Sequence, residues 1–483
     1  MASFSPLCWR LSVCVLLAGG ALLAQAQPAP LAPETLPATV NTALVQARVP
    51  ASALAVLVMD AGDSGQVYAT HRAQAPVNPA SVMKLVTTYA ALDLLGPGHT
   101  WTTPVYTDGV LKDSVLQGNL YLQGGGDPKL VTERLWLLMR RIQGLGIRRI
   151  AGDIVLDKRA FQLPPVDPGA FDGEPLRPYN AAPDALLLNF KSVVMTFTPD
   201  PSSGVAQVAV EPPLGGVALP TSVPLAANGA GCGDWRGGLK ADFSDPLRIR
   251  LAGAYPAACG ERSWPVAYAA PERFAERAVA GMWLAVGGQL DGQVREGAVP
   301  AGLAPRLNWP SVPLPEVVRD VNKFSNNVMA QHLLLSLALN NANNGPATFD
   351  GARQRVATWW RERVGADVPV PEIDNGAGLS RTARTTAQAL GRLLRTAYAT
   401  GHMPELMASL PLSGHDGTLR RSQNAVGLAH LKTGSLNEVN ALAGYVHSTQ
   451  GKRLVFVAIV NHPNAHAARP ALQALVGWAA GQP

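Results

Sequence analysis

The chain has 483 residues, of which 47% are hydrophobic, 15% are charged and 6% are aromatic. This length predicts about two to four domains, and the composition excludes a disordered, collagen-like or coiled-coil protein. The net charge of +6 comes from Lys and Arg residues that are scattered along the chain, whereas a nucleic-acid-binding protein gathers them in a stripe. We therefore expect no nucleic-acid partner, and at most a weak attraction to an anionic surface or polymer.

Residues 1–26 are typical of a secretory signal peptide. Arg10 lies in the positively charged start, residues 11–23 are apolar, and Ala24 and Ala26 form a small-x-small cleavage site. The apolar run is shorter than the roughly 20 residues that span a bilayer. We expect cleavage, export and no stable membrane anchor, and an uncleaved anchor is the alternative.

The first folded elements are predicted to be a hairpin and a helix. Residues 54–59 and 66–70 are rich in β-forming side chains on either side of a Gly-rich turn. Asn78 and Pro79 then indicate the start of a helix, as its N-cap and first helical residue. Because residues 82–95 are apolar on nearly every side, we expect this helix to be buried within the protein.

Residues 97–283 differ in character from the segment before them. Short β-like runs alternate there with Gly, Pro and Asp, at 120–122, 150–156, 193–197 and 205–210. We expect this region to be one or two inserted β-rich domains, one of them nested in another.

Cys232 and Cys259 are the two cysteines that remain once the signal peptide is removed. An even pair in an exported chain predicts a disulfide. Two buried free thiols are the alternative.

The remaining 200 residues combine helices with a final hairpin. Helical periodicity is found at 272–287, 315–323, 328–339, 347–364 and 468–480, and residues 441–448 and 453–460 predict two paired strands. We expect residues 27–96 and 284–483 to form one discontinuous α/β (α+β) domain, which the insertion 97–283 splits.

Ser81 and Lys84 form the single Ser-x-x-Lys pattern in the chain. On a helix, side chains three residues apart lie on the same face. A Ser hydroxyl needs a base to become a nucleophile, and a Lys amine can be that base if burial or a second cation lowers its pKa. By itself the pattern also fits a helix start followed by an exposed Lys.

Two further patterns are informative when they are considered together with Ser-x-x-Lys. Ser325 and Asn327 lie between two predicted helices, where alone they would indicate a helix N-cap. Residues 432–435, Lys-Thr-Gly-Ser, combine a cation, two hydroxyls and a Gly that allows close backbone approach, which suits a carboxylate at a strand edge. Ser-x-x-Lys, Ser-x-Asn and Lys-Thr-Gly in this order are the signature of penicillin-binding proteins and serine β-lactamases.

The flanking sequence resembles the D-alanyl-D-alanine carboxypeptidase/endopeptidase family, the class C low-molecular-mass penicillin-binding proteins. The stretches that carry the resemblance are NPASVMKL at 78–85, YLQGGGDP at 121–128, YNAAP at 179–183, NKFSNN at 322–327, DNGAGLSR at 374–381 and LKTGSL at 431–436. Ser81 and Ser325 are 244 residues apart, which matches that family's large insertion and exceeds the gap in single-domain β-lactamases. The resemblance implies a penicillin-binding fold and a periplasmic enzyme.

The resemblance also implies a role for each site residue. Ser81 would attack the carbonyl of a terminal D-Ala-D-Ala, or of a cross-link, in peptidoglycan stem peptides, and Lys84 would take its proton. Ser325 and Lys432 would pass a proton to the leaving amine, Asn327 would hold the acyl-side amide, and β-lactams would be covalent inhibitors. The remaining residues would bind substrate: Thr433 and Ser435 through the terminal carboxylate, Gly434 through close backbone approach, and Arg381 in a side-chain pocket.

The sequence implies no metal and no other cofactor. The one close pair of histidines, His462 and His466, has Pro463 between its members, which breaks the helix that would align them as ligands. Two alternatives stay open, a β-lactamase or esterase of the same superfamily and a non-catalytic scaffold that binds the cell wall. The patterns make no prediction for the oligomeric state.

Overall fold

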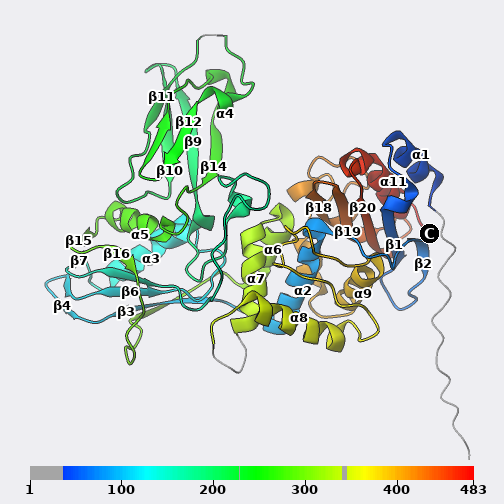
Figure 1. Ribbon diagram of the computed structural model, residues 1–483, viewed down its shortest axis with the longest axis horizontal. Helices are drawn as coiled ribbons and strands as arrows, with labels where there is room; N and C mark the ends of the chain where they lie inside the picture. The colour runs from blue at the N-terminus through cyan, green and yellow to red at the C-terminus, as the bar shows by residue number, and fades with distance from the viewer. Residues whose placement is uncertain (1–35, 228, 340–344) are drawn as a thin grey trace, which may run out of the picture.

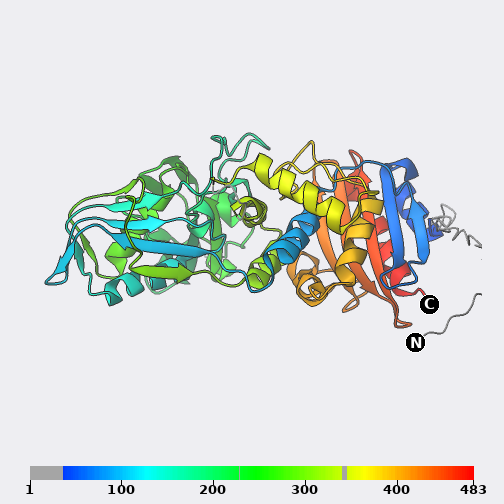
Figure 2. The ribbon, with the colours of Figure 1, turned by 90° about the horizontal axis from the view of Figure 1, so that it is seen from below.

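The computed structural model describes residues 36–227, 229–339 and 345–483. The predicted signal peptide at 1–26 lies outside these described residues. The molecule is elongated, with two regions side by side along its long axis (Figures 1 and 2). We call them the split domain, which contains both ends of the described chain, and the inserted region. Among the helices of the described residues, none has the length and apolarity needed to cross a membrane.

A five-stranded antiparallel sheet forms the centre of the split domain. Its strands, in spatial order, are β18 (Ala429–Leu436), β19 (Val439–His447), β20 (Arg453–Asn461), β1 (Leu54–Asp60) and β2 (Val67–His71). β1 pairs with β20 along its whole length, from Leu54 opposite Val460 to Asp60 opposite Leu454. Segments before and after the insertion therefore share one sheet, and the mixed α/β fold class predicted from the sequence is confirmed.

Helices cover both faces of this sheet. One face carries α1 (Ala38–Gln46) and α11 (Arg469–Ala480), and the other carries α2 (Lys84–Leu95), α6 (Leu314–Phe324), α7 (Asn327–Leu339), α8 (Phe349–Arg363), α9 (Ala387–Tyr398) and α10 (Met403–Ser409). Side chains of β1 alternate between the two cores, since Ala55 and Leu57 pack with the α2 side while Val56 and Val58 pack with the α11 side. A sheet buried on both faces requires apolar side chains on both faces, which explains why β1 and β20 are almost wholly apolar.

The helix predicted at 82–95 is buried as expected. Every residue of α2 from Lys84 to Leu92 is buried. A single turn of 3-10 helix, η2 (Ala80–Met83), precedes α2, so the predicted helix begins in a tighter form than an α-helix. This turn carries Ser81.

The described residues of the inserted region form four sheets. Two of them pack with the helices α3 (Thr132–Gly144) and α5 (Phe274–Ala285), in a hydrophobic core that continues into the other two sheets. One of them has the order β16 (Val294–Glu296), β8 (Ile154–Asp157), β6 (Leu120–Gln123), β3 (Thr102–Thr107) and β17 (Leu307–Pro310), and the other has the order β15 (Gln289–Leu290), β7 (Arg149–Ile150), β5 (Val115–Gln117) and β4 (Val110–Lys112).

The other two sheets form a separate lobe, at the upper left of Figure 1. They consist of β11 (Ser222–Pro224), β10 (Val205–Glu211), β9 (Ser192–Asp200) and β14 (Arg262–Ala267), and of β12 (Ala241–Asp245) and β13 (Arg248–Leu251), with the short helix α4 (Trp235–Gly238) beside them. The predicted disulfide between Cys232 and Cys259 is present in this lobe, with an S–S distance of 2.10 Å. The four β-like runs identified in the sequence correspond to β6, β7 with β8, β9 and β10.

The insertion ends later than the predicted residue 283. β17 pairs antiparallel with β3, from Leu307 opposite Val105 to Pro310 opposite Thr102. α5 packs into the core of the inserted region rather than against the split domain. The chain therefore returns to the split domain between Pro310 and Leu314, because the strands after α5 complete sheets begun before it.

Candidate active site

A network of hydrogen bonds fixes the turn that carries Ser81. The Asn78 side chain accepts a hydrogen bond from the Ala80 N–H at 2.9 Å and donates one to the Ser380 carbonyl at 2.9 Å. The Asn461 side-chain amide accepts a hydrogen bond from the Asn78 N–H at 2.7 Å and donates one to the Asn78 carbonyl at 2.9 Å. Ala80 has a positive φ of 47°, a strained conformation for a residue with a side chain. These contacts hold that conformation and so present Ser81 from a rigid turn.

Two glycines allow other segments to approach this turn closely. A Cβ atom on Gly378 would lie 1.9 Å from the Ala80 carbonyl oxygen, and one on Gly434 would lie 2.5 Å from the Pro79 carbonyl oxygen. Any side chain at either position would displace the turn. Gly434 therefore brings β18 against the turn, whereas the close approach that the sequence predicted was to a substrate and stays a prediction.

Lys84 lies directly behind Ser81 and is fully buried. Its Nζ is 2.9 Å from Ser81 Oγ, 2.7 Å from Asn327 Oδ1 and 2.5 Å from the Ala377 carbonyl oxygen. No carboxylate among the described residues pairs with this amine. Burial, and after it the nearby Lys432, lower the pKa of Lys84 well below its ordinary value.

Ser325 occupies the junction between α6 and α7. It adopts the left-handed conformation, with φ 59° and ψ 35°, which ends α6 and turns the chain into α7. The Asn326 side chain accepts a hydrogen bond from the Met329 N–H at 3.0 Å and thereby caps α7. Asn327 opens α7 and donates to the Tyr179 carbonyl at 3.0 Å. The helix cap expected in this motif is thus provided by Asn326, which leaves Ser325 and Asn327 to face the site.

Lys432 lies on the edge strand β18 and is also fully buried. Its Nζ donates to Ser325 Oγ at 2.9 Å and to the Thr433 carbonyl at 2.9 Å. Burial lowers its pKa to about 7. The second and third motifs therefore meet through a hydroxyl and an amine, just as the first motif pairs Ser81 with Lys84.

These groups open into one cavity of about 360 Å³. Its lining residues are Ser81, Phe171, Asp172, Tyr179, Ser325, Asn327, Leu379, Arg381, Ser435, Leu436, Asn437 and His466. The structure therefore brings together residues that are up to 385 positions apart in the chain, from Ser81 to His466. Thr433 lies just outside this group, and its Oγ1 donates to Thr418 Oγ1 at 2.9 Å.

Arg381 stands at the end of the cavity formed with the inserted region. Its guanidinium lies over the Phe171 ring, 4.9 Å from the ring centre, a cation–π contact. Phe171, Asp172 and Tyr179 belong to the inserted region, so this region contributes a wall of the site as well as a separate lobe.

Sequence reasoning did not identify the carbonyl partners or the wall from the inserted region. The Ala377 carbonyl accepts from Lys84 and the Tyr179 carbonyl accepts from Asn327, and a backbone carbonyl has no residue-type signature. Both lie within stretches that resemble the family, so their neighbourhood was detectable but their contacts were not. In the described residues, no three His, Cys, Asp or Glu side chains gather as a metal site would require.

The chemistry available here is that of a serine nucleophile with an amine base. A hydroxyl lies within hydrogen-bond distance of a buried amine whose pKa is lowered, and a second amine–hydroxyl pair lies across the same cavity. Such a pair can activate the nucleophile, and the second pair can handle a proton on the leaving side.

Comparisons with known proteins agree with this arrangement. Residues 36–482 match the D-Ala-D-Ala carboxypeptidase 3 (S13) family. The chain is 29% identical to the D-alanyl-D-alanine carboxypeptidase of Actinomadura sp. (strain R39) over 441 residues, which cover 86% of this chain and 79% of that protein. It is 23% identical to the D-alanyl-D-alanine carboxypeptidase DacB of Haemophilus influenzae over 413 residues, or 83% of each chain. The crystal structure of penicillin binding protein 4 from H. influenzae matches with a TM-score of 0.70 at 22% identity, over 90% of this chain and 99% of that one, which establishes the fold.

Proposed function

Because the chain belongs to the D-Ala-D-Ala carboxypeptidase 3 (S13) family, we propose that it hydrolyses both the terminal D-Ala-D-Ala bond of peptidoglycan stem peptides and the cross-links between them. The reaction proceeds through an acyl-enzyme on Ser81. The observation that carries the proposal is the 2.9 Å contact between Ser81 Oγ and the Lys84 amine, which is buried without a carboxylate partner among the described residues.

The acylation step uses Lys84 as the base. In its neutral form the amine has two N–H groups and one lone pair. The Asn327 and Ala377 oxygens accept the two N–H groups, so the lone pair is left for the Ser81 hydroxyl proton. Ser81 Oγ then attacks the carbonyl carbon, and the backbone N–H groups of Ser81 and Ser435 stabilise the oxyanion.

The leaving amine receives its proton on the opposite side of the cavity. Ser325 and Lys432 form the relay, in which the Ser325 hydroxyl gives its proton to the amine and is reprotonated by the Lys432 ammonium. A pKa of about 7 lets Lys432 give and regain a proton near neutral pH. The C–N bond breaks, the amine leaves, and water then hydrolyses the ester on Ser81 to release the acyl half.

Substrate binding divides between two ends of the cavity. On the acyl side, one N–H of the Asn327 amide donates to Tyr179, and the second, which donates to no described residue, can bind a substrate carbonyl. Arg381 and Phe171 line the pocket for the substrate side chain. On the leaving side, the Thr433 and Ser435 hydroxyls bind the carboxylate that follows the scissile bond.

β-Lactams are the second class of ligand that we propose. Penicillin binding protein 4 from H. influenzae, which shares this fold, has been solved in complex with a β-lactam. A β-lactam presents a strained amide to Ser81 and a carboxylate to Thr433 and Ser435, in the places of the peptide and its terminal carboxylate. The predicted export signal would bring the enzyme to peptidoglycan, and we propose the periplasm as its location.

The test combines acylation with product analysis. The protein without residues 1–26 is incubated with benzylpenicillin, and intact mass spectrometry should show one full-mass adduct in the wild type and none in Ser81→Ala. Ser64→Ala, at an exposed turn of the split domain, is the matched control and should acylate normally. Monomeric pentapeptides and cross-linked muropeptide dimers are then digested, and product masses report both activities.

Three results would contradict the proposal. An adduct on Ser81→Ala would exclude Ser81 as the nucleophile. Rapid turnover of nitrocefin without muropeptide cleavage would favour a β-lactamase, and a folded wild type that neither acylates nor cleaves would favour a scaffold.

A further inference from the structure

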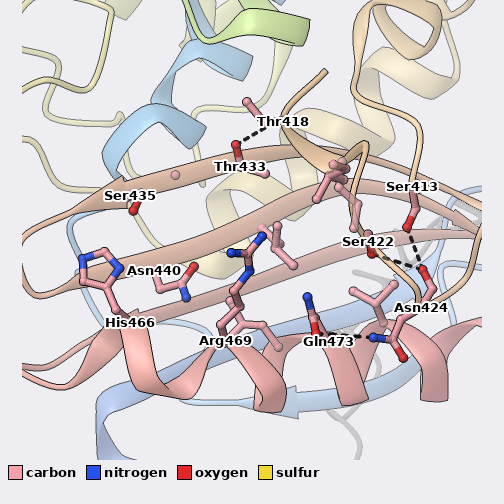
Figure 3. Close-up of a pocket in the computed structure, with 16 residues that line it drawn as sticks. Ser413, Thr418, Ser422, Asn424, Thr433, Ser435, Asn440, His466, Arg469 and Gln473 are labelled. Carbon is pink, nitrogen blue, oxygen red and sulfur yellow. Dashed lines mark hydrogen bonds between the residues drawn. The ribbon is translucent and has the colours of Figure 1, made fainter. Parts of the chain in front are cut away.

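A second cavity lies beside the site, on the opposite side of the edge strand. It has a volume of about 270 Å³ and lies between β18, the loop that contains the 3-10 helix η6 (Gly417–Leu419), and α11 (Figure 3). Ser435 and His466 line both this cavity and the one that contains Ser81. The two cavities are therefore neighbours across Ser435, and we call the second one the α11 cavity.

The α11 cavity combines an apolar base with a polar rim and one strong cation. Leu431, Leu442, Leu472 and Val476 supply the apolar part, and Ser, Thr, Asn and Gln side chains supply most of the rest. Arg469 is the sole Arg or Lys among the lining residues, and none of them is Asp or Glu. The lining of the cavity, within the part of the chain that the structure describes, thus favours an anionic group.

The Arg469 guanidinium has no protein partner within the described chain. It makes no hydrogen bond or ion pair with any described residue, and Figure 3 shows it pointing from α11 toward the strands of the sheet, near Asn440. A guanidinium has five N–H donors in a fork that matches a carboxylate. The Arg469 guanidinium, which pairs with no described residue, lies beside a cavity that no carboxylate lines. It can therefore bind the carboxylate of a ligand.

The position of the cavity identifies which part of a ligand reaches it. Asn327 and Arg381 bind the acyl side, whereas Thr433 and Ser435 bind the leaving side. The α11 cavity is lined by Thr433 and Ser435 and by neither Asn327 nor Arg381. A group that enters it is therefore attached to the leaving amine.

The size of the α11 cavity indicates which of the two leaving groups, D-alanine or a second stem peptide, can occupy it. D-Alanine ends at the carboxylate that Thr433 and Ser435 hold, so it does not extend farther. The leaving half of a cross-link is a second stem peptide, which continues beyond the scissile bond and carries further carboxylates. A volume of 270 Å³ is close to the lower limit of about 300 Å³ for ligand pockets, enough for part of a peptide.

We propose that the α11 cavity binds the leaving half of a cross-linked stem peptide, and that Arg469 recognises a carboxylate of that half. Arg469 is then a specificity-determining residue, which favours cross-link cleavage over removal of a terminal D-Ala. This inference rests on the proposed function, since it assumes that Ser81 is acylated by peptides.

The experiment compares Arg469→Gln with Arg421→Gln. Arg421 is an exposed residue on the same loop as η6 and does not line the cavity, so its variant removes the same charge without touching the site. For each protein, kcat/KM is measured with a pentapeptide monomer and a cross-linked dimer, together with the rate of acylation by penicillin. A third substrate is the dimer whose leaving-half carboxylates are amidated, apart from the one next to the scissile bond, which Thr433 and Ser435 bind.

We expect Arg469→Gln to lower kcat/KM for the dimer by about 10- to 100-fold, the range for a lost hydrogen bond to a charged group. The change should fall mainly on KM. Monomer cleavage and penicillin acylation should stay within about twofold, and the amidated dimer should be insensitive to the substitution. Arg421→Gln should behave as wild type with all substrates.

Equal losses for monomer and dimer would overturn the proposal, because Arg469 would then serve the carboxylate that both substrates share. Unchanged dimer cleavage would overturn it as well. If the wild type is neither acylated by penicillin nor active on any peptide, the proposed function itself fails, an outcome distinct from both.

Discussion

The two buried lysines of the active site differ in their partners from two largely buried lysines of the inserted region. In the inserted region, Lys158 and Lys191 lie 3.4 and 3.3 Å from the Asp184 carboxylate, and Lys158 also pairs with Glu296. In the split domain, Lys84 and Lys432 bond to hydroxyl, amide and carbonyl oxygens instead of carboxylates.

This difference in partners reverses the direction of the pKa shift. Burial opposes the charged form of Lys158, but Asp184 and Glu296 outweigh it and raise the pKa. Burial of Lys432 is not compensated in this way, and its pKa falls to about 7. Burial alone therefore does not decide how a lysine titrates, because a carboxylate partner determines whether it stays a cation or can act as a base.

The sharpest test of this contrast is Lys84→Arg. Arginine keeps the charge and a similar reach, but its pKa above about 12 prevents it from giving up a proton in a protein. If Lys84 acts as the base for Ser81, the second-order rate of acylation by a fluorescent penicillin should fall by about 10²–10⁴-fold across pH.

Lys452→Arg, at an exposed hairpin turn, is the control and should acylate as the wild type does. Lys432→Arg keeps a cation and a donor near the carboxylate, but it cannot reprotonate Ser325, so it should slow acylation as well. Circular dichroism identifies variants that fail to fold, and Lys84→Gln offers a second base-free variant. A folded Lys84→Arg protein that acylates within about tenfold of wild type would exclude Lys84 as the base.

In the inserted region the test removes a carboxylate instead of a lysine, because there the carboxylate compensates for the burial of the lysines. Asp184→Asn leaves Lys158 and Lys191 largely buried without their shared counter-charge, and we expect a loss of about 3–5 kcal/mol in the free energy of unfolding. Asp291→Asn is the matched control, because the Arg149–Asp291 pair is exposed and such pairs contribute about 0–1 kcal/mol. Urea unfolding measures both, and equal losses would contradict the importance of burial here.

The disulfide tests whether the lobe of the inserted region is separable from the chemistry. The variant Cys232→Ser with Cys259→Ser should lower the stability of that lobe by about 2–4 kcal/mol. Limited proteolysis should then cut first between β9 and β14, while penicillin still acylates Ser81 at the wild-type rate. A parallel loss of acylation would show that the lobe supports the site.

Much of the site followed from residue types and their order. The three-residue spacing predicted that Ser81 and Lys84 share one face, and their side chains are 2.9 Å apart. The strand predicted at residues 432–435 lies in β18, but the contact of Lys432 with Ser325 depends on the fold. The boundary near Pro310 was missed because α5 has the same amphipathic pattern whichever core it enters. Arg469 was missed because one arginine at a helix start carries no signal until the fold brings it near Ser435.

The smallest predicted effect concerns Lys432, because burying this lysine in its charged form lowers the free energy of unfolding. Its pKa is about 7 in the folded protein and about 10.4 in an unfolded chain. Between these values the unfolded chain binds more protons, so the contribution of Lys432 to the free energy of unfolding increases with pH. Below pH 7 the lysine is charged in both the folded and the unfolded chain. At such pH values it lowers the free energy of unfolding by its full amount.

Lys432→Met should therefore stabilise the protein, by about 1–2 kcal/mol at pH 6, and the gain should shrink as the pH approaches 10. Urea unfolding of the variant and the wild type at pH 6, 8 and 10 measures the difference, in which the titration of other groups largely cancels. Lys452→Met, at an exposed hairpin turn, should show no such trend. A gain in the free energy of unfolding that is the same at all three pH values would mean that methionine packs better at this position. It would contradict a lowered pKa of Lys432 in the folded protein.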